Sequence, residues 1–455
     1  MMRIDSKTSV LVYGLGKSGS SAVNYFMKCR ANVTITDDKP FYDLRFILEP
    51  YLEGGAHFKH PGEIGFSVCD FDLVLLSPGV SVDKPFLQMA RACKIPVMSD
   101  VELAFEQIKA FWTAVTGTNG KTTTTSLIGD IFQKYFSRVI VAGNIGDPIC
   151  DYIQHVSPSQ HVVVEVSSYQ LEHIFKFRPQ VAIVLNVSND HLERHKSMEG
   201  YIHSKQRIFE NQQEDDILIL NYDDQVVRHF AMSAHSRVLF YTTNTVVQEG
   251  AFVKNKAIVV RMNGTIQEIC SLNDITLRGK HNLGNVMAAI LAAVVWKVPV
   301  DQIRLMIKSF QPLSHRMEYV GKYKNVRVYN DSKATNMDAL ARALESFDNS
   351  IVLIAGGEDK GGPMDEVVGL ISEKVKRVVL FGKDVSRFQT AIRDVPVESF
   401  PSLREAVTYA LSKTAPHDVL LFSPGGSSFD LYSNFEERGN DFKKIIEELS
   451  GKLKV

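Results

Sequence analysis

Short apolar runs alternate with amphipathic segments over the first hundred residues. Residues 9–13, 32–36 and 73–76 are apolar runs of strand length, whereas residues 20–28 and 85–93 carry apolar side chains at helical spacing. Strands that alternate with helices are typical of a parallel sheet with helices on its faces. The pattern therefore predicts an α/β domain at the start of the chain.

The same alternation continues to the C-terminus. In the middle of the chain the strand candidates are residues 111–115, 139–142, 161–166, 181–187, 217–221, 238–241 and 257–262, and the helix candidates are residues 123–135 and 286–296. In the last third the strand candidates are residues 326–329, 351–355, 377–381 and 419–422. Continuous runs of Val, Ile and Leu indicate strands buried on both faces, as in mostly parallel sheets. We therefore expect the α/β class throughout.

The length of the chain, 455 residues, exceeds what one hydrophobic core supports and suits about three domains of ~150 residues. Changes in the pattern place these domains at residues 1–99, 100–312 and 313–455. The joints near Ser99 and Pro312 are short, so we expect the domains to move as hinged bodies over a shared cleft.

Composition narrows the possible partners. The formal net charge is −1, with 45% hydrophobic and 23% charged residues, and this balance gives no reason to expect nucleic acid or an anionic membrane as a partner. No apolar run approaches the roughly 18 residues of a membrane span. Residues 1–9 lack a hydrophobic signal core, so we expect a cytoplasmic protein, and a monomer.

The five cysteines are scattered along the chain, at Cys29, Cys69, Cys93, Cys150 and Cys270. Their number is odd, and no two of them form a C-x-x-C pair. We therefore expect reduced thiols, and neither a disulfide framework nor a zinc site.

The most informative motif lies between a predicted strand and a predicted helix. Residues 116–123 read Thr-Gly-Thr-Asn-Gly-Lys-Thr-Thr, and the backbone N–H groups of a glycine turn at a helix start can hold phosphate oxygens. Lys121 is placed to reach the terminal phosphates of a nucleotide, and the Thr122 hydroxyl to bind Mg²⁺. The strict G-x-x-x-x-G-K-[ST] pattern fails at one position, because Val115 stands where the first glycine belongs. We predict a triphosphate site of a variant type.

A second glycine motif, Gly-Leu-Gly-Lys-Ser-Gly at residues 14–19, follows the first strand, and the acid Asp37 comes after the second. This order is typical of dinucleotide-binding proteins. Three interpretations stay open: a nucleotide such as a UDP-sugar, NAD(P), or a turn that only packs a helix on a strand. A phosphate loop follows where a hydride-transfer domain would be needed, which favours the UDP-sugar. The turn Ser77-Pro78-Gly79-Val80, after the next strand, is placed to form another edge of that pocket.

Two polar segments follow buried strands of the central domain. Glu165 ends the apolar run 161–165, and a buried carboxylate there needs a metal or another partner; an exposed strand-end Glu is the alternative. Asp190 and His191 also follow a strand, at the edge where open α/β sheets build their sites. A structural, hydrogen-bonded histidine is the alternative for His191. Lys205 has the pattern of an ordinary helix-surface lysine.

Three strands of the third domain end in small polar loops, at residues 330–336, 356–362 and 423–430. Because parallel strands end at one edge of a sheet, the repetition favours a site for an anionic substrate there.

These motifs, taken in order, resemble those of the Mur ligase family over nearly the whole chain. The shared patterns are T-G-T-N-G-K-T, E-V-S-S-Y-Q-L-E, N-x-S-x-D-H-L-x-R-H, G-x-H-N-x-x-N, H-R-M-E and N-D-S-K-A-T-N. The last pattern, with Ser-Pro-Gly-Gly-Ser-Ser-Phe-Asp at residues 423–430, is similar to that of the D-glutamate-adding branch. The resemblance implies an N-terminal Rossmann-like domain, a central P-loop ATPase-like domain and a C-terminal Rossmann-like domain.

The resemblance also implies roles for single residues. For UDP-N-acetylmuramoyl-L-alanine it implies contacts from Lys17, Ser18, Asp37, Asp38, Lys39, Ser77, Gly79 and Asn144. For ATP it implies Gly117, Thr118, Asn119, Gly120, Lys121, Thr122, Thr123, Asn285, Arg316 and Asp331. For D-glutamate it implies Lys333, Thr335, Lys360, Ser428 and Phe435. For Mg²⁺, in two sites, it implies Thr122, Glu165, His191 and Lys205, with Lys205 carbamylated. The residues expected to serve catalysis are Lys121, His191 and Lys205.

The activity implied by the resemblance is an ATP-dependent amide ligase of peptidoglycan precursor synthesis. Its reaction passes through an acyl phosphate and needs no covalent enzyme nucleophile, so catalysis rests on positioning and electrostatics. Alternatives are a folylpolyglutamate synthetase-like ligase, a non-catalytic nucleotide-sugar binder and an NAD-dependent oxidoreductase. The N-terminal domain ahead of the phosphate loop disfavours the first alternative. The presence of Lys121, Glu165 and His191 disfavours the second.

Overall fold

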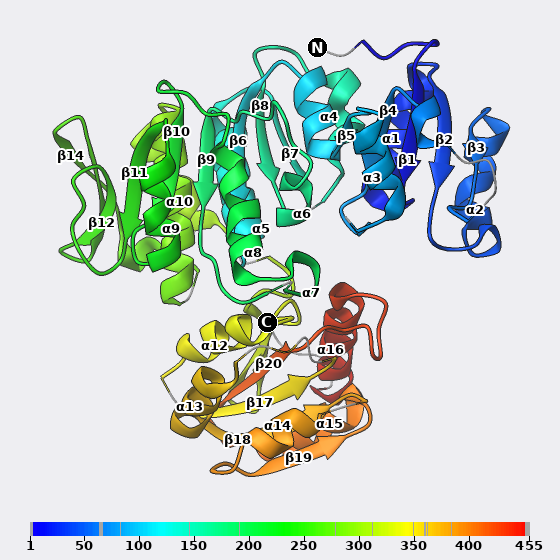
Figure 1. Ribbon diagram of the computed structural model, residues 1–455. Coiled ribbons are helices and arrows are strands. Elements are labelled where there is room, and N and C mark those ends of the chain that lie inside the picture. The colour runs from blue at the N-terminus through cyan, green and yellow to red at the C-terminus, as the bar shows by residue number, and fades with distance from the viewer. Residues whose placement is uncertain are drawn as a thin grey trace. The chain divides into compact units, whose positions relative to one another are not determined.

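The computed structural model describes residues 3–62, 67–81, 83–144, 146–190, 192–277, 279–311, 313–348, 350–358, 361, 363–383 and 385–450. They form three β-sheets with helices packed on them, coloured from blue to red along the chain in Figure 1. The α/β class is thereby confirmed. Two compact units result: one is Met1–Val187, His191–Ser271 and Asn285–Met306, and the other is Ser188–Asp190, Leu272–Gly284 and Ile307–Val455. We propose domain boundaries at residues 1–99, 100–312 and 313–455, with one sheet in each domain.

The first sheet has five strands in the order β3-β2-β1-β4-β5, all parallel. The strands are β1 Ser9–Tyr13, β2 Asn32–Thr36, β3 His57–Phe58, β4 Leu73–Leu76 and β5 Val97–Met98. The helices of this region are α1 Lys17–Lys28, α2 Phe41–Glu53, η1 Val68–Asp70, α3 Pro85–Ala92 and α4 Asp100–Gln107. Strand order reverses between β1 and β4, and open parallel sheets bind ligands beyond such a switch point.

The central sheet has nine strands in the order β14-β13-β12-β11-β10-β9-β6-β8-β7. They are β6 Phe111–Thr116, β7 Val139–Gly143, β8 His161–Glu165, β9 Val181–Val184, β10 Ile217–Asn221, β11 Arg237–Thr242, β12 Gly250–Lys254, β13 Ala257–Met262 and β14 Thr265–Ser271. Strands β6 to β12 run parallel, and β12, β13 and β14 form an antiparallel meander at one edge. The helices are α5 Lys121–Tyr135, η2 Ile149–His155, α6 Ser168–Leu171, α7 Leu192–His195, α8 Met198–Gln206, η3 Arg207–Phe209, α9 Gln225–His229, η4 Phe230–Ser233, η5 Leu272–Asp274, α10 Lys280–Val295 and α11 Val300–Ser309.

The third sheet has six strands in the order β15-β16-β20-β17-β18-β19. They are β15 Glu318–Tyr323, β16 Val326–Asn330, β17 Ile351–Gly356, β18 Val375–Phe381, β19 Val397–Phe400 and β20 Val419–Gly425. Only the β15–β16 pair is antiparallel. The helices are α12 Met337–Glu345, α13 Asp365–Lys374, α14 Ser386–Ala391, α15 Leu403–Ser412 and α16 Phe435–Ser450. Separate apolar clusters lie on the two faces of this sheet, since alternate residues of β16, β17, β18 and β20 point to opposite faces.

The joint at Ser99 is buried and hydrogen-bonded. The Ser99 side chain accepts from Glu102 N at 3.4 Å and caps helix α4, while Ser99 N donates to His173 O at 3.0 Å. The first two sheets accordingly belong to one compact unit. The other expected joint residue, Pro312, lies outside the described residues.

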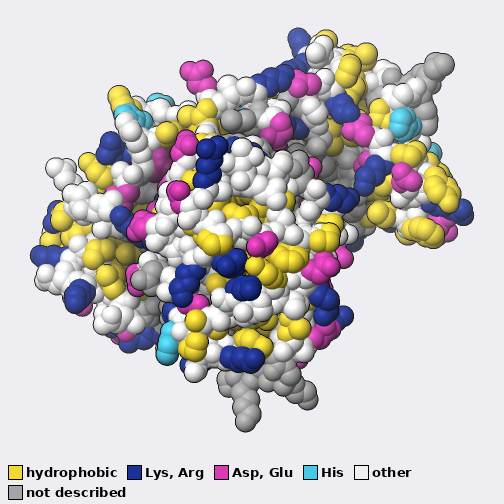
Figure 2. All heavy atoms as spheres, turned by 90° about the horizontal axis from the view of Figure 1, so that it is seen from below, with side chains coloured by type: hydrophobic (Ala, Val, Ile, Leu, Met, Phe, Trp, Pro, Cys, Tyr) yellow, Lys and Arg dark blue, Asp and Glu magenta, His cyan; other side chains and the backbone are white. Residues whose placement is uncertain are grey.

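The described surface mixes charges of both signs. On the face shown in Figure 2, Lys and Arg side chains are interspersed with Asp and Glu. In the part of the chain that the structure describes, no helix combines the length and the apolar character that crossing a membrane requires.

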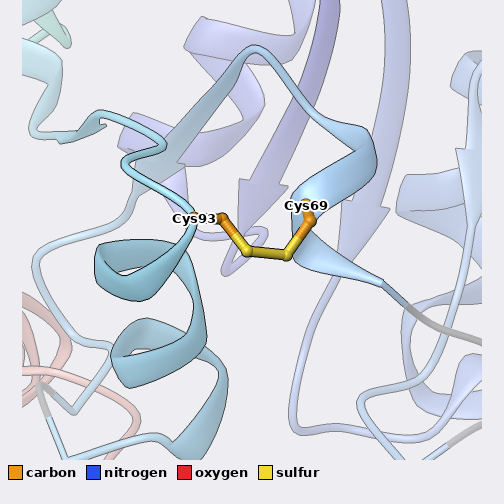
Figure 3. The surroundings of a disulfide bond; sticks show 2 residues. All are labelled: Cys69 and Cys93. Carbon is orange, nitrogen blue, oxygen red and sulfur yellow. A yellow bond between two sulfur atoms is a disulfide. The ribbon is translucent and has the colours of Figure 1, made fainter.

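Cys69 and Cys93 form a disulfide bond, drawn in Figure 3, with their Cα atoms 5.7 Å apart. The expectation that all five cysteines are reduced is therefore wrong for this pair, whereas Cys29, Cys150 and Cys270 are outside the disulfide. Cys69 lies in η1 and Cys93 at the end of α3, with β4 between them in sequence. The fold of β4 and α3 brings the two residues within the range of a disulfide, which their separation of 24 residues did not indicate.

A thiol count tests this bond. Protein unfolded in guanidinium without reductant is expected to expose three thiols, and five after reduction, because only one pair is linked. The Cys69→Ser variant is the control, since its count should not change on reduction. Five thiols in the unreduced protein would show that the bond is absent in solution.

Candidate active site

The glycine turn after β6 has the geometry of a phosphate loop. Gly117 and Gly120 have φ of 153° and 84°, a region that side chains other than glycine rarely adopt. Gly120 precedes the first residue of α5, and a Cβ on it would lie 2.3 Å from Asn285 Oδ1. The turn therefore keeps its backbone N–H groups at the positive end of a 15-residue helix, where phosphate oxygens bind.

Asn186 fixes the shape of this turn from the neighbouring strand. Its Oδ1 accepts from Asn119 N at 2.8 Å, and its Nδ2 donates to Asn119 O at 2.9 Å. Its backbone O accepts from Thr118 N at 3.0 Å. Asn186 follows β9, which pairs with β6. Asn186 opens the N-x-S-x-D-H-L-x-R-H motif, but the motif alone did not indicate this role.

Two lysines donate to backbone carbonyls of the same turn. Lys121 Nζ donates to Gly117 O at 2.8 Å and to Thr118 O at 2.7 Å. Lys205 Nζ, from α8, donates to Gly117 O at 2.8 Å and lies 4.4 Å from the centre of the Tyr201 ring. Lys205 is only 1% exposed, so the surface position that its sequence context indicated is wrong. Burial of an ammonium is costly, and here a carbonyl and an aromatic face offset part of that cost.

The carboxylate of Glu165 binds two other expected site residues, Thr122 and Asn144. Glu165 is 2% exposed, so the alternative of an exposed strand-end Glu is excluded. Its Oε2 accepts from Thr122 Oγ1 at 2.8 Å and its Oε1 from Asn144 Nδ2 at 2.9 Å. Glu165 ends β8, Thr122 lies in the first turn of α5, and Asn144 directly follows β7.

This cluster fits the group that the motifs imply. A threonine hydroxyl and a carboxylate beside a phosphate loop are hard oxygen donors, the kind that Mg²⁺ prefers. Thr118 and Thr123 are also buried around the turn. His191, the expected histidine ligand, lies outside the described residues.

In the first sheet, the loops after β1 and β4 touch at the switch point. Ser77 Oγ donates to Gly14 O at 2.7 Å, and a Cβ on Gly19 would lie 1.8 Å from Gly14 O. Gly14 and Gly19 therefore allow the loops after β1 and β4 to pack closely, in addition to any role in binding a ligand. Gly79 is exposed with open space beside it, and Lys17 is also exposed.

The two acids after β2 have different partners. Asp37 accepts from two backbone N–H groups, Leu15 at 2.7 Å and Lys39 at 2.9 Å, and so holds the β1 and β2 loops together. Asp38 accepts from Tyr13 Oη at 2.5 Å and from Lys84 Nζ at 2.6 Å. Hydrogen bonds from Lys84 and Tyr13 outweigh partial burial and hold the pKa of Asp38 below its usual value. No motif indicated these contacts of Tyr13 and Lys84.

In the second unit, the loops after β16, β17 and β20 meet. Glu358 and Ser427 exchange backbone hydrogen bonds of 3.0 and 2.8 Å, and Ser427 Oγ donates to Glu358 Oε2 at 2.8 Å. Asp331 Oδ2 accepts from Ser423 Oγ at 2.9 Å, and its Oδ1 from Met317 N at 3.1 Å. The three polar loops thus form one region, as their positions after parallel strands predicted.

The residues expected near D-glutamate are placed as follows. Lys333 Nζ lies 4.6 Å from the centre of the Phe435 ring. Ser428 is buried, and Thr335 is half-buried. Arg316, expected to contact ATP, is half-buried, and its charge only partly opposes the burial that raises the pKa of Asp331. Lys360 lies outside the described residues.

A buried arginine, to which the sequence analysis gave no role, holds these loops. Arg438 of α16 is fully buried. It donates to Ser332 O at 2.7 Å and Ser332 Oγ at 3.1 Å, and to Gly426 O and Ser427 O at 3.1 and 3.0 Å. Burial lowers its pKa to about 10. One guanidinium therefore sets the spacing between the β16 and β20 loops, a use that suits its fixed fork of donors.

The pKa of Asp331 gives a test of this region. Burial raises it from 3.8 to about 7, although hydrogen bonds from Met317 and Ser423 oppose the shift. Between pH 4 and pH 7 the folded state therefore binds more protons at Asp331 than the unfolded state does, and stability falls as the pH rises.

Asp331→Asn should remove this dependence, which is worth up to about 4 kcal/mol for a shift of this size. Unfolding temperatures of both proteins from pH 4 to pH 8 measure it. As the pH rises, the unfolding temperature of Asp331→Asn should increase relative to that of the wild type. If the two unfolding temperatures change in parallel with pH, the raised pKa of Asp331 is contradicted.

Three family models match this chain, one in each of the three proposed domains. Family models match at residues 8–99 (Mur ligase MurD-like, N-terminal domain), 115–293 (Mur ligase middle domain) and 315–426 (Mur ligase, glutamate ligase domain). The UDP-N-acetylmuramoylalanine–D-glutamate ligase of Koribacter versatilis is 40% identical, over 97% of each chain. The protein of the same name from Thermoanaerobacter sp. is 38% identical over 97% of this chain and 98% of its own.

A solved structure shows the same fold. The MurF ligase from Thermotoga maritima in complex with ADP is 15% identical and superposes with a TM-score of 0.62, over 92% of this chain and 96% of its own. The family resemblance inferred from the motifs is confirmed by the family models and the curated relatives. The chain belongs to the Mur ligase family.

Proposed function

We propose that this chain joins D-glutamate to UDP-N-acetylmuramoyl-L-alanine at the expense of ATP, a step of peptidoglycan precursor synthesis. The observation that carries the proposal is the Glu165 cluster. One buried carboxylate there binds the phosphate-loop hydroxyl of Thr122 and the expected substrate contact, Asn144. Relatives that bear the name of this activity match along nearly the whole chain.

The reaction needs two anions to meet. The alanyl carboxylate of the UDP-substrate attacks the γ-phosphorus of ATP, and ADP leaves, which gives an acyl phosphate. Lys121, together with the backbone N–H groups of residues 117–121, offsets the negative charge that gathers there. Mg²⁺, held by Thr122, Glu165, His191 and modified Lys205, would add Lewis-acid stabilisation of the phosphate oxygens.

The second step forms the amide bond. The α-amine of D-glutamate attacks the acyl carbon, a proton leaves the nitrogen, and the tetrahedral intermediate expels inorganic phosphate. We propose that Lys333, Thr335, Lys360, Ser428 and Phe435 surround D-glutamate, with Arg438 holding two of the loops that carry them. Asn285, Arg316 and Asp331 would contact ATP. We propose that Lys17, Ser18, Asp37, Asp38, Lys39, Ser77 and Gly79 bind the UDP portion.

Phosphate release tests the function. With ATP and UDP-N-acetylmuramoyl-L-alanine, release should require D-glutamate and should not occur with L-glutamate, meso-diaminopimelate or L-lysine. Lys121→Ala should lower kcat by about 100-fold or more, because a preorganised charge at the phosphates is lost. Release with another amino acid would keep the acyl-phosphate chemistry and exclude the D-glutamate assignment. No release with any of them would exclude the ligase, and folate substrates would then be tried.

We also propose that Lys205 works as a carbamate. Its neutral amine would attack CO₂ and release a proton, leaving an anionic group suited to a hard cation. The buried amine already lies against the phosphate loop through Gly117 O, and a carbamate retains one N–H for that bond. The modification also removes the cost of a buried ammonium.

Loss and rescue test the carbamate. Lys205→Ala should lower kcat by about 100-fold, as loss of a metal-supporting group does, and short carboxylic acids should restore part of it. Lys176→Ala, which removes an exposed ion pair with Glu106 in the same unit, is the control and should respond to neither change. Full activity of Lys205→Ala without added acid would exclude the role.

A further inference from the structure

Two buried carboxylates at the start of α4 have no part in the reaction just described. Asp100 and Glu102 are both fully buried. Glu102 accepts from the backbone N–H groups of Phe175, Lys176 and Phe177 at 2.8–3.0 Å, so its negative charge is matched by three donors. Glu102 therefore has a sufficient structural role.

Asp100 differs, because its hydrogen bonds are incomplete. Oδ1 accepts from Gln170 Nε2 and from Val101 N, both at 2.9 Å. Oδ2 has no partner of hydrogen-bond geometry among the described residues. Burial raises the pKa of Asp100, whereas the side chains of Gln170 and, next, Ser18 favour its ionised form. A buried oxygen without a full partner is costly and calls for an explanation.

Gln170 connects Asp100 to the Glu165 cluster. Its Oε1 accepts from Ser167 N at 2.9 Å, and Ser167 Oγ accepts from Gln170 N at 3.3 Å, a capping box that fixes the start of α6. Ser167 is two residues after Glu165, and Val166 between them is buried and bonded to Val115 O at 2.9 Å. A shift of the Gln170 side chain therefore acts on the short segment that carries Glu165.

Ser18 is the second residue of α1 and belongs to the glycine motif proposed to bind the UDP-substrate. Its hydroxyl can serve either a phosphate oxygen of the substrate or the Asp100 carboxyl, since both are acceptors. Ser18, Asp100 and Gln170 all belong to one compact unit. The chain of contacts thus runs from the UDP-binding loop to the segment that ends the phosphate site.

We propose that Asp100 is a positioning residue that sets the UDP-binding loop against the Glu165 segment through its contacts with Ser18 and Gln170. The inference rests on the proposed function, which requires the alanyl end of a substrate held by its UDP to reach the γ-phosphorus of ATP. A displacement of about 1 Å between such groups can cost about 100-fold in rate. Asp100 touches no reacting atom and acts only through these two side chains.

An exchange of the acid and amide groups between Asp100 and Gln170 tests the proposal. Gln170→Glu keeps the acceptor for Ser167 N but replaces the donor to Asp100 with a second acidic group. We expect the KM for the UDP-substrate to rise about tenfold, the scale of a typical coupling between sites, and the KM for ATP to change less than about twofold. The double variant Asp100→Asn with Gln170→Glu restores a donor in the opposite direction and should return the KM to within about twofold of wild type.

KM separates this role from a structural one, because KM does not depend on how much folded enzyme is present. Ser21→Ala is the matched control. It removes a side-chain hydrogen bond between α1 and η2, from Ser21 Oγ to Asp151 Oδ1 at 2.6 Å, which does not involve the Glu165 segment. Its KM values should equal those of wild type. If Gln170→Glu does not fold, Gln170→Met replaces it in the test. This variant removes the amide donor to Asp100 without adding an acid, and the same rise in the KM for the UDP-substrate is expected.

Two results would overturn the proposal. One is a wild-type KM for the UDP-substrate in the Gln170 variant. The other is a KM that is raised in Gln170→Glu and stays raised in the double variant Asp100→Asn with Gln170→Glu. Calorimetric titration of the UDP-substrate without ATP measures the same change without turnover. If the wild-type protein binds this substrate but releases no phosphate, only the proposed function is excluded. The binding constants of the variants would still decide the role of Asp100.

Discussion

Parallel strands deliver the residues that follow them to one edge of the sheet, and each candidate site in this chain depends on that constraint. The phosphate loop follows β6, which lies between β8 and β9. Glu165 ends β8 and Asn186 follows β9, so the strand order alone places a carboxylate and an amide on either side of the loop. The same rule brings the β1 and β4 loops together in the first sheet, and the β16, β17 and β20 loops in the third.

Three buried charges, Arg438, Lys205 and Glu102, are matched by backbone groups. Arg438 donates to three carbonyls, Lys205 to one, and Glu102 accepts from three N–H groups. A backbone partner cannot rotate away as an opposing side chain can, so each charge fixes the course of the chain around it. Removal of such a group would leave several buried backbone atoms without partners, a larger loss than that of a surface ion pair.

The strands that sequence analysis predicted well are the ones buried on both faces. β1, β2, β4, β10 and β13 have the expected limits, because continuous apolar runs mark them. β14, β15 and β19 are edge strands with exposed positions, and β3 and β5 have two residues each, so their patterns are too weak to recognise. Motifs located the Glu165 cluster, but the burial of Lys205 depends on α8 packing against a turn 88 residues earlier. No local pattern reports such a contact, and the same holds for the Cys69–Cys93 bond and for Arg438.

The hydrogen bonds of Lys121 within its own turn affect which anions the phosphate loop can bind. Its ammonium already donates to two carbonyls of its own turn, so an incoming anion has to exchange those bonds for better ones. A single phosphate ion brings few contacts with which to compensate, whereas a triphosphate also engages the backbone N–H groups along the turn. From these bonds we expect the loop to favour a triphosphate over a single phosphate ion.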